Sequence, residues 1–198
     1  MQRVVNGFQW PEYDIVSSIS VWGTLDALDA AVALCPQRRV AVHVGAGVGV
    51  WTKRLADAFG VVYAFEPDHD NFSHLCRNCD APNVIRLQAA LGGIAGHTAL
   101  MGDRRDCGQI WLERKGNVPV LTLDSFKLEA LDFLAITTEG FETYVLKGAG
   151  DTLAKHRPVV LAESSGKGWK YGFEEDDLDR AVTDYKVENR PPYKVLTP

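Results

Sequence analysis

Short apolar runs alternate with longer amphipathic stretches along this chain from about residue 40 onward. Short apolar runs are typical of buried strands, and apolar residues at three- or four-residue steps are typical of helices. Their regular succession predicts an α/β fold with helices on both faces of a mostly parallel sheet. The pattern predicts strands over 39–44, 61–66, 83–91, 131–138 and 158–163, and helices over 50–59, 68–79, 141–156 (broken near Gly148 and Gly150) and 174–184. Two short segments, 185–189 and 193–197, close the chain.

Two parts of the chain depart from this alternation. Residues 92–123 contain short apolar runs joined by Gly-rich turns, which predicts a small β insertion with antiparallel strands. The first 24 residues, with Trp10, Pro11 and Trp22, show no regular pattern, so we expect an irregular segment there. Since 198 residues suffice for one core and no repeat or linker divides them, we expect a single domain over 1–198.

The composition limits the classes of partner. Hydrophobic residues make up 46% and charged residues 24%, as in soluble globular proteins. The formal net charge of -5 argues against nonspecific binding to nucleic acid, which needs an excess of Lys and Arg. No apolar run approaches the roughly 20 residues that span a bilayer, and the N-terminus lacks the apolar core of a signal peptide. We therefore expect a cytoplasmic protein without membrane contact.

The segment VHVGAGVGVWT joins an expected strand to an expected helix through Gly45, Gly47 and Gly49. A Gly-rich first turn lets a ligand approach the backbone, and the following helix offers free N–H groups. The turn lacks the Gly-Lys-Ser/Thr of a phosphate loop, and its G-x-G-x-G spacing differs from a dinucleotide loop. Glu66 ends the next strand about 20 residues on, where a carboxylate accepts both hydroxyls of a ribose. A nucleoside without phosphate, such as S-adenosylmethionine, fits both features; a tight turn with a surface glutamate is the alternative.

Five segments occur in one order between about residues 40 and 163: VGAGVGVWT, YAFEPDHDNFSHLCRN, VPVLTLDSF, EGFETYVLKGA and RPVVLAE. As a set they resemble the FkbM-type methyltransferases, a branch of the class I S-adenosylmethionine-dependent superfamily. The resemblance implies a Rossmann-like, doubly wound, seven-stranded sheet. It also implies methyl transfer, usually to an oxygen of a sugar, polyketide or other small-molecule acceptor. The residues that it assigns to the cofactor are Gly45, Gly47 and Gly49 at the methionine end, Glu66 at the ribose, and Ala90 and Leu91 near the adenine.

Three positions depart from the family pattern. The family usually carries an acid where this chain has His43, and Lys and Asp where it has Ala135 and Thr137. His43 is either a cofactor contact at the amino-acid end or a buried core residue. Because these departures bear on catalysis more than on cofactor binding, the main alternative is a catalytically lapsed binding or assembly module. A nicotinamide-dependent oxidoreductase is a third hypothesis, and the glycine spacing disfavours it.

Two carboxylates are the candidate catalytic groups. An activated methyl group can be transferred largely by holding donor and acceptor in line, and a base that takes the acceptor's proton assists. Glu139 follows an apolar strand at the ligand-facing end; the alternative is an acid that binds free N–H groups at a helix start. Glu163 ends the next strand and can act with Glu139. Thr137 and Thr138 are candidate substrate contacts, although such residues are ordinary in strands.

Two further motifs each have a structural alternative. The segment SSGKGWKYGF offers Trp169 as a substrate contact, or it is an exposed linker. Cys76 and Cys79 form a C-x-x-C pair, but the other two cysteines lie far away in sequence. A zinc site needs four ligands, so helix packing is favoured and no metal site is expected.

Overall fold

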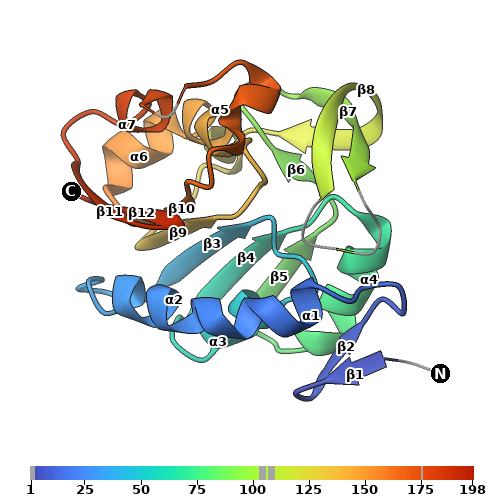
Figure 1. Ribbon diagram of the computed structural model, residues 1–198. Coiled ribbons are helices and arrows are strands. Elements are labelled where there is room, and N and C mark those ends of the chain that lie inside the picture. The colour runs from blue at the N-terminus through green and yellow to red at the C-terminus, as the bar shows by residue number, and fades with distance from the viewer. Residues whose placement is uncertain (1–2, 103–105, 107–109, 175) are drawn as a thin grey trace.

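One seven-stranded sheet with helices on both faces makes up most of the protein, as the computed structural model shows (Figure 1). The structure describes residues 3–102, 106, 110–174 and 176–198, without the side chains of 110–115. The strand order is β11 (Lys186–Arg190), β12 (Tyr193–Thr197), β10 (Val159–Glu163), β9 (Phe133–Ile136), β3 (Val40–Val44), β4 (Val61–Phe65) and β5 (Val84–Leu87). Strands β10, β9, β3, β4 and β5 pair in parallel, whereas β12 is antiparallel to β10 and β11. The expected α/β class is confirmed, with a mixed sheet.

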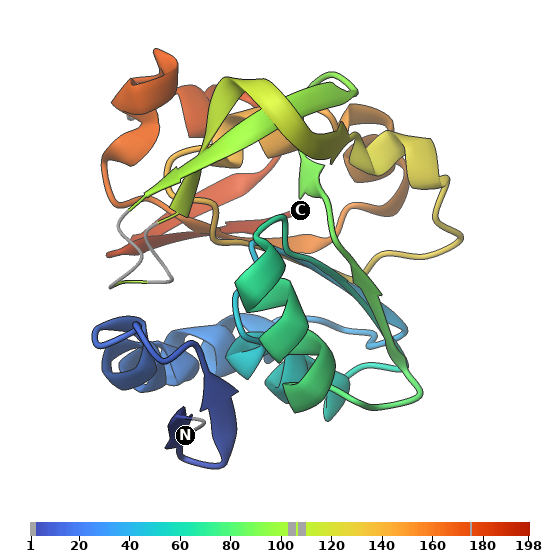
Figure 2. The ribbon, with the colours of Figure 1, turned by 90° about the vertical axis from the view of Figure 1, so that its right-hand side faces the viewer.

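Two layers of helices cover the sheet (Figures 1 and 2). One layer contains α1 (Ser17–Ser20), the 3-10 helix η1 (Val21–Thr24), α2 (Leu25–Val32), α3 (Val50–Ala56) and α4 (His69–Asn78). The other contains α5 (Glu142–Lys147), α6 (Gly150–His156) and α7 (Asp177–Arg180), with the 3-10 helices η2 (Leu123–Phe126) and η3 (Lys167–Tyr171) on the same side. Within the described residues, no helix has the length and apolar character to cross a bilayer.

Alternate side chains of the central strands belong to separate cores on the two faces. On β9, Phe133 and Ala135 pack in the core under α2, α3 and α4, and Leu134 and Ile136 pack under α5 and α6. A strand that is buried on both faces appears in sequence as a continuous apolar run. This explains why the short apolar runs predicted these strands.

The ends of two helices follow from local residues. Asp68 caps α4, because its Oδ1 accepts hydrogen bonds from the backbone N–H groups of Asp70 at 3.0 Å and Asn71 at 2.9 Å. The expected break in the 141–156 helix lies between α5 and α6. A Cβ at Gly148 would lie 2.0 Å from the carbonyl oxygen of Gly92, so only glycine fits there.

The third expected strand was too long. β5 ends at Leu87, and the next residues form β6 (Ala90–Leu91), which belongs to a separate three-stranded sheet of order β6–β8–β7. β7 (Gly96–Gly102) and β8 (Ile110–Leu121) are antiparallel, as expected for the insertion. Two of the short apolar runs in this region, 109–113 and 118–123, contribute to the single strand β8, which pairs with β7. Gln109, the first residue of one run, lies outside the described residues.

The prediction of an irregular N-terminal segment was wrong. Strands β1 (Arg3–Val5) and β2 (Phe8–Trp10) form a hairpin next to α4, visible in Figures 1 and 2. Its turn is Asn6-Gly7, both with positive φ, which is a strong hairpin sequence. Asn78 of α4 bonds both backbone groups of Gln9, at 2.8 and 2.9 Å. The predicted 174–184 helix was also too long, since α7 spans only Asp177–Arg180.

Candidate active site

The three glycines of the β3–α3 turn have different roles. All have positive φ, at +80° for Gly45, +54° for Gly47 and +99° for Gly49. A Cβ at Gly45 would lie 2.0 Å from the carbonyl oxygen of Thr137, and one at Gly49 would lie 2.5 Å from Cys79 Sγ. A Cβ at Gly47 would meet nothing within 4 Å. Gly45 and Gly49 are therefore required by packing, whereas Gly47 leaves open space above the turn.

Cys79 is part of this packing. Its thiol lies against Gly49 and donates a hydrogen bond to the Gly49 carbonyl oxygen at 3.2 Å. Burial raises the pKa of Cys79 to about 12, so the thiol is protonated at neutral pH. This is the packing role that the sequence favoured for the C-x-x-C pair. Among the described residues, no group of three His, Cys, Asp or Glu is placed to hold a metal ion.

Glu66 is buried beside the turn and bonds its backbone. Glu66 Oε2 accepts a hydrogen bond from Gly47 N–H at 2.7 Å, and Oε1 accepts one from Asp68 N–H at 2.9 Å. Burial raises the pKa of Glu66 to about 7, although these hydrogen bonds oppose the rise. The carboxyl group therefore changes charge near neutral pH while it faces a cavity.

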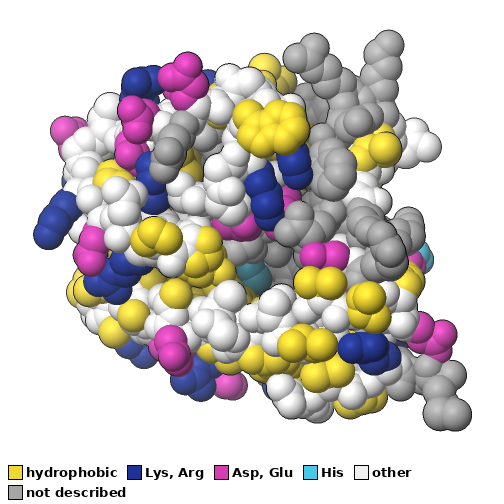
Figure 3. Space-filling view, viewed as in Figure 1, with side chains coloured by type: hydrophobic (Ala, Val, Ile, Leu, Met, Phe, Trp, Pro, Cys, Tyr) yellow, Lys and Arg dark blue, Asp and Glu magenta, His cyan; other side chains and the backbone are white. Residues whose placement is uncertain are grey.

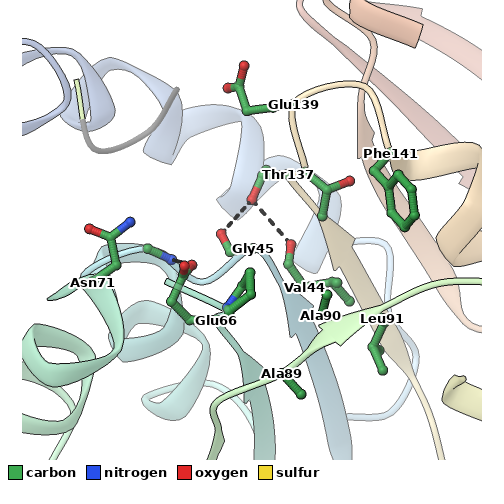
Figure 4. Close-up of a pocket in the computed structure, with 13 residues that line it drawn as sticks. Val44, Gly45, Glu66, Asn71, Ala89, Ala90, Leu91, Thr137, Glu139 and Phe141 are labelled. Carbon is green, nitrogen blue, oxygen red and sulfur yellow. Dashed lines mark hydrogen bonds between the residues drawn. The ribbon is translucent and has the colours of Figure 1, made fainter. Parts of the chain in front are cut away.

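We call this cavity the Glu66 pocket; it encloses about 70 Å³. Figure 4 shows Glu66 and Asn71 on one side of it, Ala89, Ala90 and Leu91 along another, and Glu139 beyond Thr137. It is lined by Val44, Gly45, Gly47, Glu66, Pro67, Asn71, Ala89, Ala90, Leu91, Thr137, Thr138, Glu139 and Phe141. The structure thus brings together five of the seven predicted cofactor residues; Gly49 and His43 lie outside this pocket. Phe141 was not predicted, because it begins a helix rather than ending a strand.

A second cavity of about 290 Å³, the His43 pocket, adjoins the first. Gly45, Gly47, Thr137 and Glu139 line both, so the two form one cleft over the glycine turn. The other residues that line the His43 pocket are Trp10, Val16, Ser17, Ser20, Val21, Thr24, His43, Ala46, Val48, Val50, Trp51, Asp106, Glu163 and Tyr193. Figure 3 shows this face hollowed near its centre, with acidic and histidine side chains at the hollow.

His43 is a buried, neutral side chain at the base of its pocket. Its Nδ1 lies 2.9 Å from Thr52 Oγ1, its Nε2 lies 3.4 Å from Thr137 Oγ1, and its ring stacks on Trp51. Burial lowers the pKa of His43 to about 3. The histidine thus has the contacts of a core residue while it also lines the cleft.

Glu139 and Glu163 are brought together by a lysine. Lys167 Nζ of η3 lies 2.5 Å from Glu139 Oε2 and 3.5 Å from Glu163 Oε1. Burial and the charge of Glu163 raise the pKa of Glu139 to about 7, and Lys167 opposes that rise. A Cβ at Gly140 would lie 2.4 Å from the carbonyl oxygen of Lys167, so the backbone of η3 also packs on this turn.

Glu142 has the helix-start role that was the alternative for Glu139. Glu142 Oε1 accepts hydrogen bonds from Thr138 N–H at 2.8 Å, Gly140 N–H at 3.2 Å and the Thr138 hydroxyl at 3.0 Å. Burial, with the charge of Glu163, raises the pKa of Glu142 to about 7. Sequence reasoning did not single out Glu142, although an acid in a first helical turn suggests this role. Glu142 thus accepts the hydrogen bonds of this turn, and the Glu139 carboxylate pairs with Lys167.

The three predicted substrate residues lie in different surroundings. Thr137 lines both pockets, and its hydroxyl donates to the Gly45 carbonyl oxygen at 3.1 Å, which ties β9 to the glycine turn. Thr138 lines only the Glu66 pocket, with its hydroxyl on Glu142. Trp169 on η3 is 73% exposed and lines neither pocket. Of these three residues, only Thr137 therefore lies where the two pockets meet.

Comparison with known proteins shows the family of this chain. The family model described as "Methyltransferase FkbM domain" matches residues 43–186. No curated protein matches the chain.

Among solved structures, the FkbM methyltransferase of Methylobacillus flagellatus KT is similar with a TM-score of 0.56 and 16% identity. The similarity covers 96% of this chain and 56% of that one, so the present chain spans little more than half of that protein's length. A putative methyltransferase of Streptococcus mutans in complex with SAH has a TM-score of 0.56 and 14% identity over 87% and 94% of the two chains. A putative rRNA-methylase of Clostridium thermocellum has a TM-score of 0.57 and 9% identity over 86% and 93%. At these identities the likeness is one of fold.

Proposed function

Since this chain belongs to the FkbM methyltransferase family, we propose that it binds S-adenosylmethionine in the Glu66 pocket and methylates an acceptor held in the His43 pocket. The acceptor atom is an oxygen of a small molecule or sugar. The observation that carries this proposal is the continuous cleft over the glycine turn, with a buried carboxylate at one end and a carboxylate pair at the other.

The lining of the Glu66 pocket suits the nucleoside part of this cofactor, which would extend beyond the enclosed 70 Å³. Glu66 accepts hydrogen bonds from the backbone of Gly47 and Asp68 and from the Asn71 side chain, and a carboxylate has about four acceptor positions, so it retains capacity for one ribose hydroxyl. Ala90, Leu91 and Phe141 supply apolar surface for a purine. The open space beside Gly47 admits a ligand against the backbone. His43 lies on the other side of the turn, where we propose that it borders the amino-acid end.

In the His43 pocket, Glu139 is the proposed general base. The bound cofactor would supply a methyl group on a positively charged sulfur. Glu139 would accept the proton of the acceptor hydroxyl, and a pKa near neutrality suits a base at neutral pH. Lys167 and Glu163 orient that carboxylate, and Thr137 fixes the glycine turn between donor and acceptor. Most of the acceleration would come from holding the two reactants in line.

The position of two residues in the sheet weakens the alternative of a binding or assembly module that has lost catalysis. Two of the three departures, at His43 and Ala135, lie side by side as register partners on the parallel strands β3 and β9. An acid and a lysine at these positions would form one ion pair, so its loss removes both charges together. Losing such a pair leaves no unpaired buried charge, and Glu139 and Glu66 are retained. The third departure, Thr137, lines both pockets and is the one that bears on catalysis.

Titration calorimetry with S-adenosylhomocysteine tests the cofactor site. Wild-type protein should bind at micromolar concentration, and Glu66→Ala should bind about a hundredfold more weakly, because hydrogen bonds to a charged group are lost. Glu129→Ala, which removes an exposed glutamate, is the matched control and should bind normally. Failure of the wild type to bind would overturn the proposed function.

An acceptor screen with radiolabelled cofactor then tests catalysis. Glu139→Gln should lower turnover about a hundredfold while S-adenosylhomocysteine binding is kept, since the base contributes only to proton removal. Cofactor binding without methyl transfer to any acceptor would instead favour a binding or assembly module.

A further inference from the structure

One wall of the His43 pocket comes from a segment outside the matched family domain. Of its lining residues, Trp10, Val16, Ser17, Ser20, Val21 and Thr24 all precede residue 43, where the family match begins. The family domain thus supplies the glycine turn and the carboxylates, and the preceding segment supplies the opposite wall.

This wall is held in place by buried contacts. Asp14 is fully buried, and its carboxylate accepts hydrogen bonds from the N–H groups of Ser17 at 3.2 Å and Ser18 at 2.8 Å. Trp51 Nε1–H of α3 donates to Thr24 Oγ1 at 2.8 Å. The wall is therefore fixed to the glycine-turn helix, and its side chains have defined positions in the cleft.

The charged side chains that line the pocket are acidic. Its charged lining residues are Asp106, Glu139 and Glu163, and among the described lining residues there is no lysine or arginine. Lys167 lies between Glu139 and Glu163, and Lys170 also acts on Glu139, so these two cations offset part of the negative charge to which Asp106 adds. A phosphate or carboxylate on the acceptor would be repelled in a cavity where water screens poorly.

The uncharged surface of the pocket is aromatic, aliphatic and hydroxyl-bearing. Trp10, Trp51 and Tyr193 present ring surface, and Ser17, Ser20 and Thr24 present hydroxyls. Val16 lines the pocket and is 44% exposed, so apolar surface continues toward solvent along α1. Figure 3 shows hydrophobic side chains below the hollow, in the region of the first helical layer.

We propose that the segment Trp10–Thr24 selects the acceptor, and that the His43 pocket takes a hydroxylated acceptor with an apolar body and no negative charge. The inference rests on the proposed function, because it assigns the acceptor to this end of the cleft. Phosphorylated and carboxylated acceptors are disfavoured by charge, and Ser20 places a hydroxyl at the pocket where it can bond the acceptor.

Matched probes that differ only in charge test this selection. Benzyl alcohol and benzoate are titrated separately into 15N-labelled protein loaded with S-adenosylhomocysteine, after cofactor binding has been verified by calorimetry on the same sample. The indole N–H signals of Trp10 and Trp51 report on the pocket, and Trp10→Phe assigns one of them. Benzyl alcohol should shift these signals, and benzoate should bind about tenfold more weakly.

A positive charge placed on the wall should remove most of the preference for benzyl alcohol over benzoate. Ser20→Lys adds a cation to an exposed lining residue and should tighten benzoate binding about fivefold, as an exposed ion pair does. Ile19→Lys, on the same helix but outside the lining, is the control and should leave benzoate binding unchanged.

Equal or tighter binding of benzoate to the wild type would overturn the inference. So would a cofactor-loaded protein whose two indole signals respond to neither probe. Absence of cofactor binding is a different result, which overturns the proposed function itself.

Discussion

The two ends of the cleft are built in different ways. The Glu66 pocket is formed by residues at the ends of neighbouring parallel strands, and Glu66 bonds the backbone of the turn and of its own strand end. The His43 pocket combines side chains from the N-terminal segment, residue 106 and the ends of β10 and β12. One end therefore depends on backbone conformation, and the other depends on side chains from distant parts of the chain. A ligand common to many proteins can be bound by the first kind of site, whereas the second kind can differ from one protein to the next.

The largest expected effect is a loss of stability from substitution in the glycine turn, at the end of the cleft that depends on backbone conformation. Gly45→Ala should lower the free energy of unfolding by about 4 kcal/mol, because its Cβ would collide with the Thr137 carbonyl in a left-handed conformation. Gly47→Ala should cost only about 1 kcal/mol, since strain remains but the space is open. Urea unfolding of both variants measures the difference. Equal losses would show that packing on Thr137 is not what requires glycine.

A charge buried at the His43 pocket, the end of the cleft that depends on side chains, should have the next largest effect on stability. His43→Asp places a carboxylate in a dry core without a cation and should lower the free energy of unfolding by about 3 kcal/mol. Adding Ala135→Lys, on the neighbouring strand, should restore part of the loss. Urea unfolding of both single variants and the double variant gives the coupling. A double variant as unstable as the sum of the two single variants would contradict the idea that these positions form a pair.

Stability should fall as pH rises from 6.5 to 8, and both ends of the cleft contribute. The pKa values of Glu66, Glu139 and Glu142 are about 7 in the folded protein and near 4.5 when unfolded. In this range the folded state binds more protons than the unfolded state, so the free energy of unfolding should decrease by about 2 kcal/mol. Urea unfolding across this range measures the slope.

Two controls separate the contributions to this pH dependence. Glu66→Gln should reduce the slope by about one third, which assigns that share to the Glu66 pocket. The pKa of His43 is lowered in the folded protein, so His43 makes the free energy of unfolding rise with pH. This happens only below about pH 6.5, where the unfolded histidine gains a proton that the folded one does not. A flat profile from 6.5 to 8 would show that these carboxyl groups are ionised in the folded protein.

The smallest expected effect concerns the lysine at the acceptor end. Lys167→Met should raise the pKa of Glu139 further, because the cation that favours its ionised form is gone. Lys167→Arg should keep it near the wild-type value. Carboxyl-carbon NMR titration of the glutamates measures both, with the Glu66 signal as internal reference. An unchanged Glu139 midpoint in Lys167→Met would mean that the ion pair does not set its protonation.

Local patterns were sufficient for much of the fold and for the Glu66 pocket. Apolar runs predicted the parallel strands because those strands are buried on both faces. Asp68 predicted the start of α4 through its side-chain cap. The glycine turn and Glu66 could be paired in advance, because the ends of adjacent parallel strands meet at one edge of a sheet.

The pattern failed where pairing partners lie far apart or where a turn was overlooked. Ala90 continues the apolar run of β5, yet it pairs with β8, some thirty residues later in the chain. The N-terminal hairpin has strands of three residues, too short for a periodicity, and its Asn6-Gly7 turn was the one available indication. Because the position of this segment was not predicted, one wall of the His43 pocket could not be predicted either.

The sequence by itself determined the α/β alternation, the left-handed glycine turn and the carboxylate that follows the second strand of the sheet, because each depends on residues close together in the chain. Only the tertiary structure decided that Glu142 binds the turn while Glu139 pairs with Lys167, and that His43 lies opposite Ala135. Chemically similar residues acquire different roles through neighbours that folding brings from distant positions. Spacing in the sequence does not encode those neighbours, since they are set by how the strands order and where the connecting segments pack.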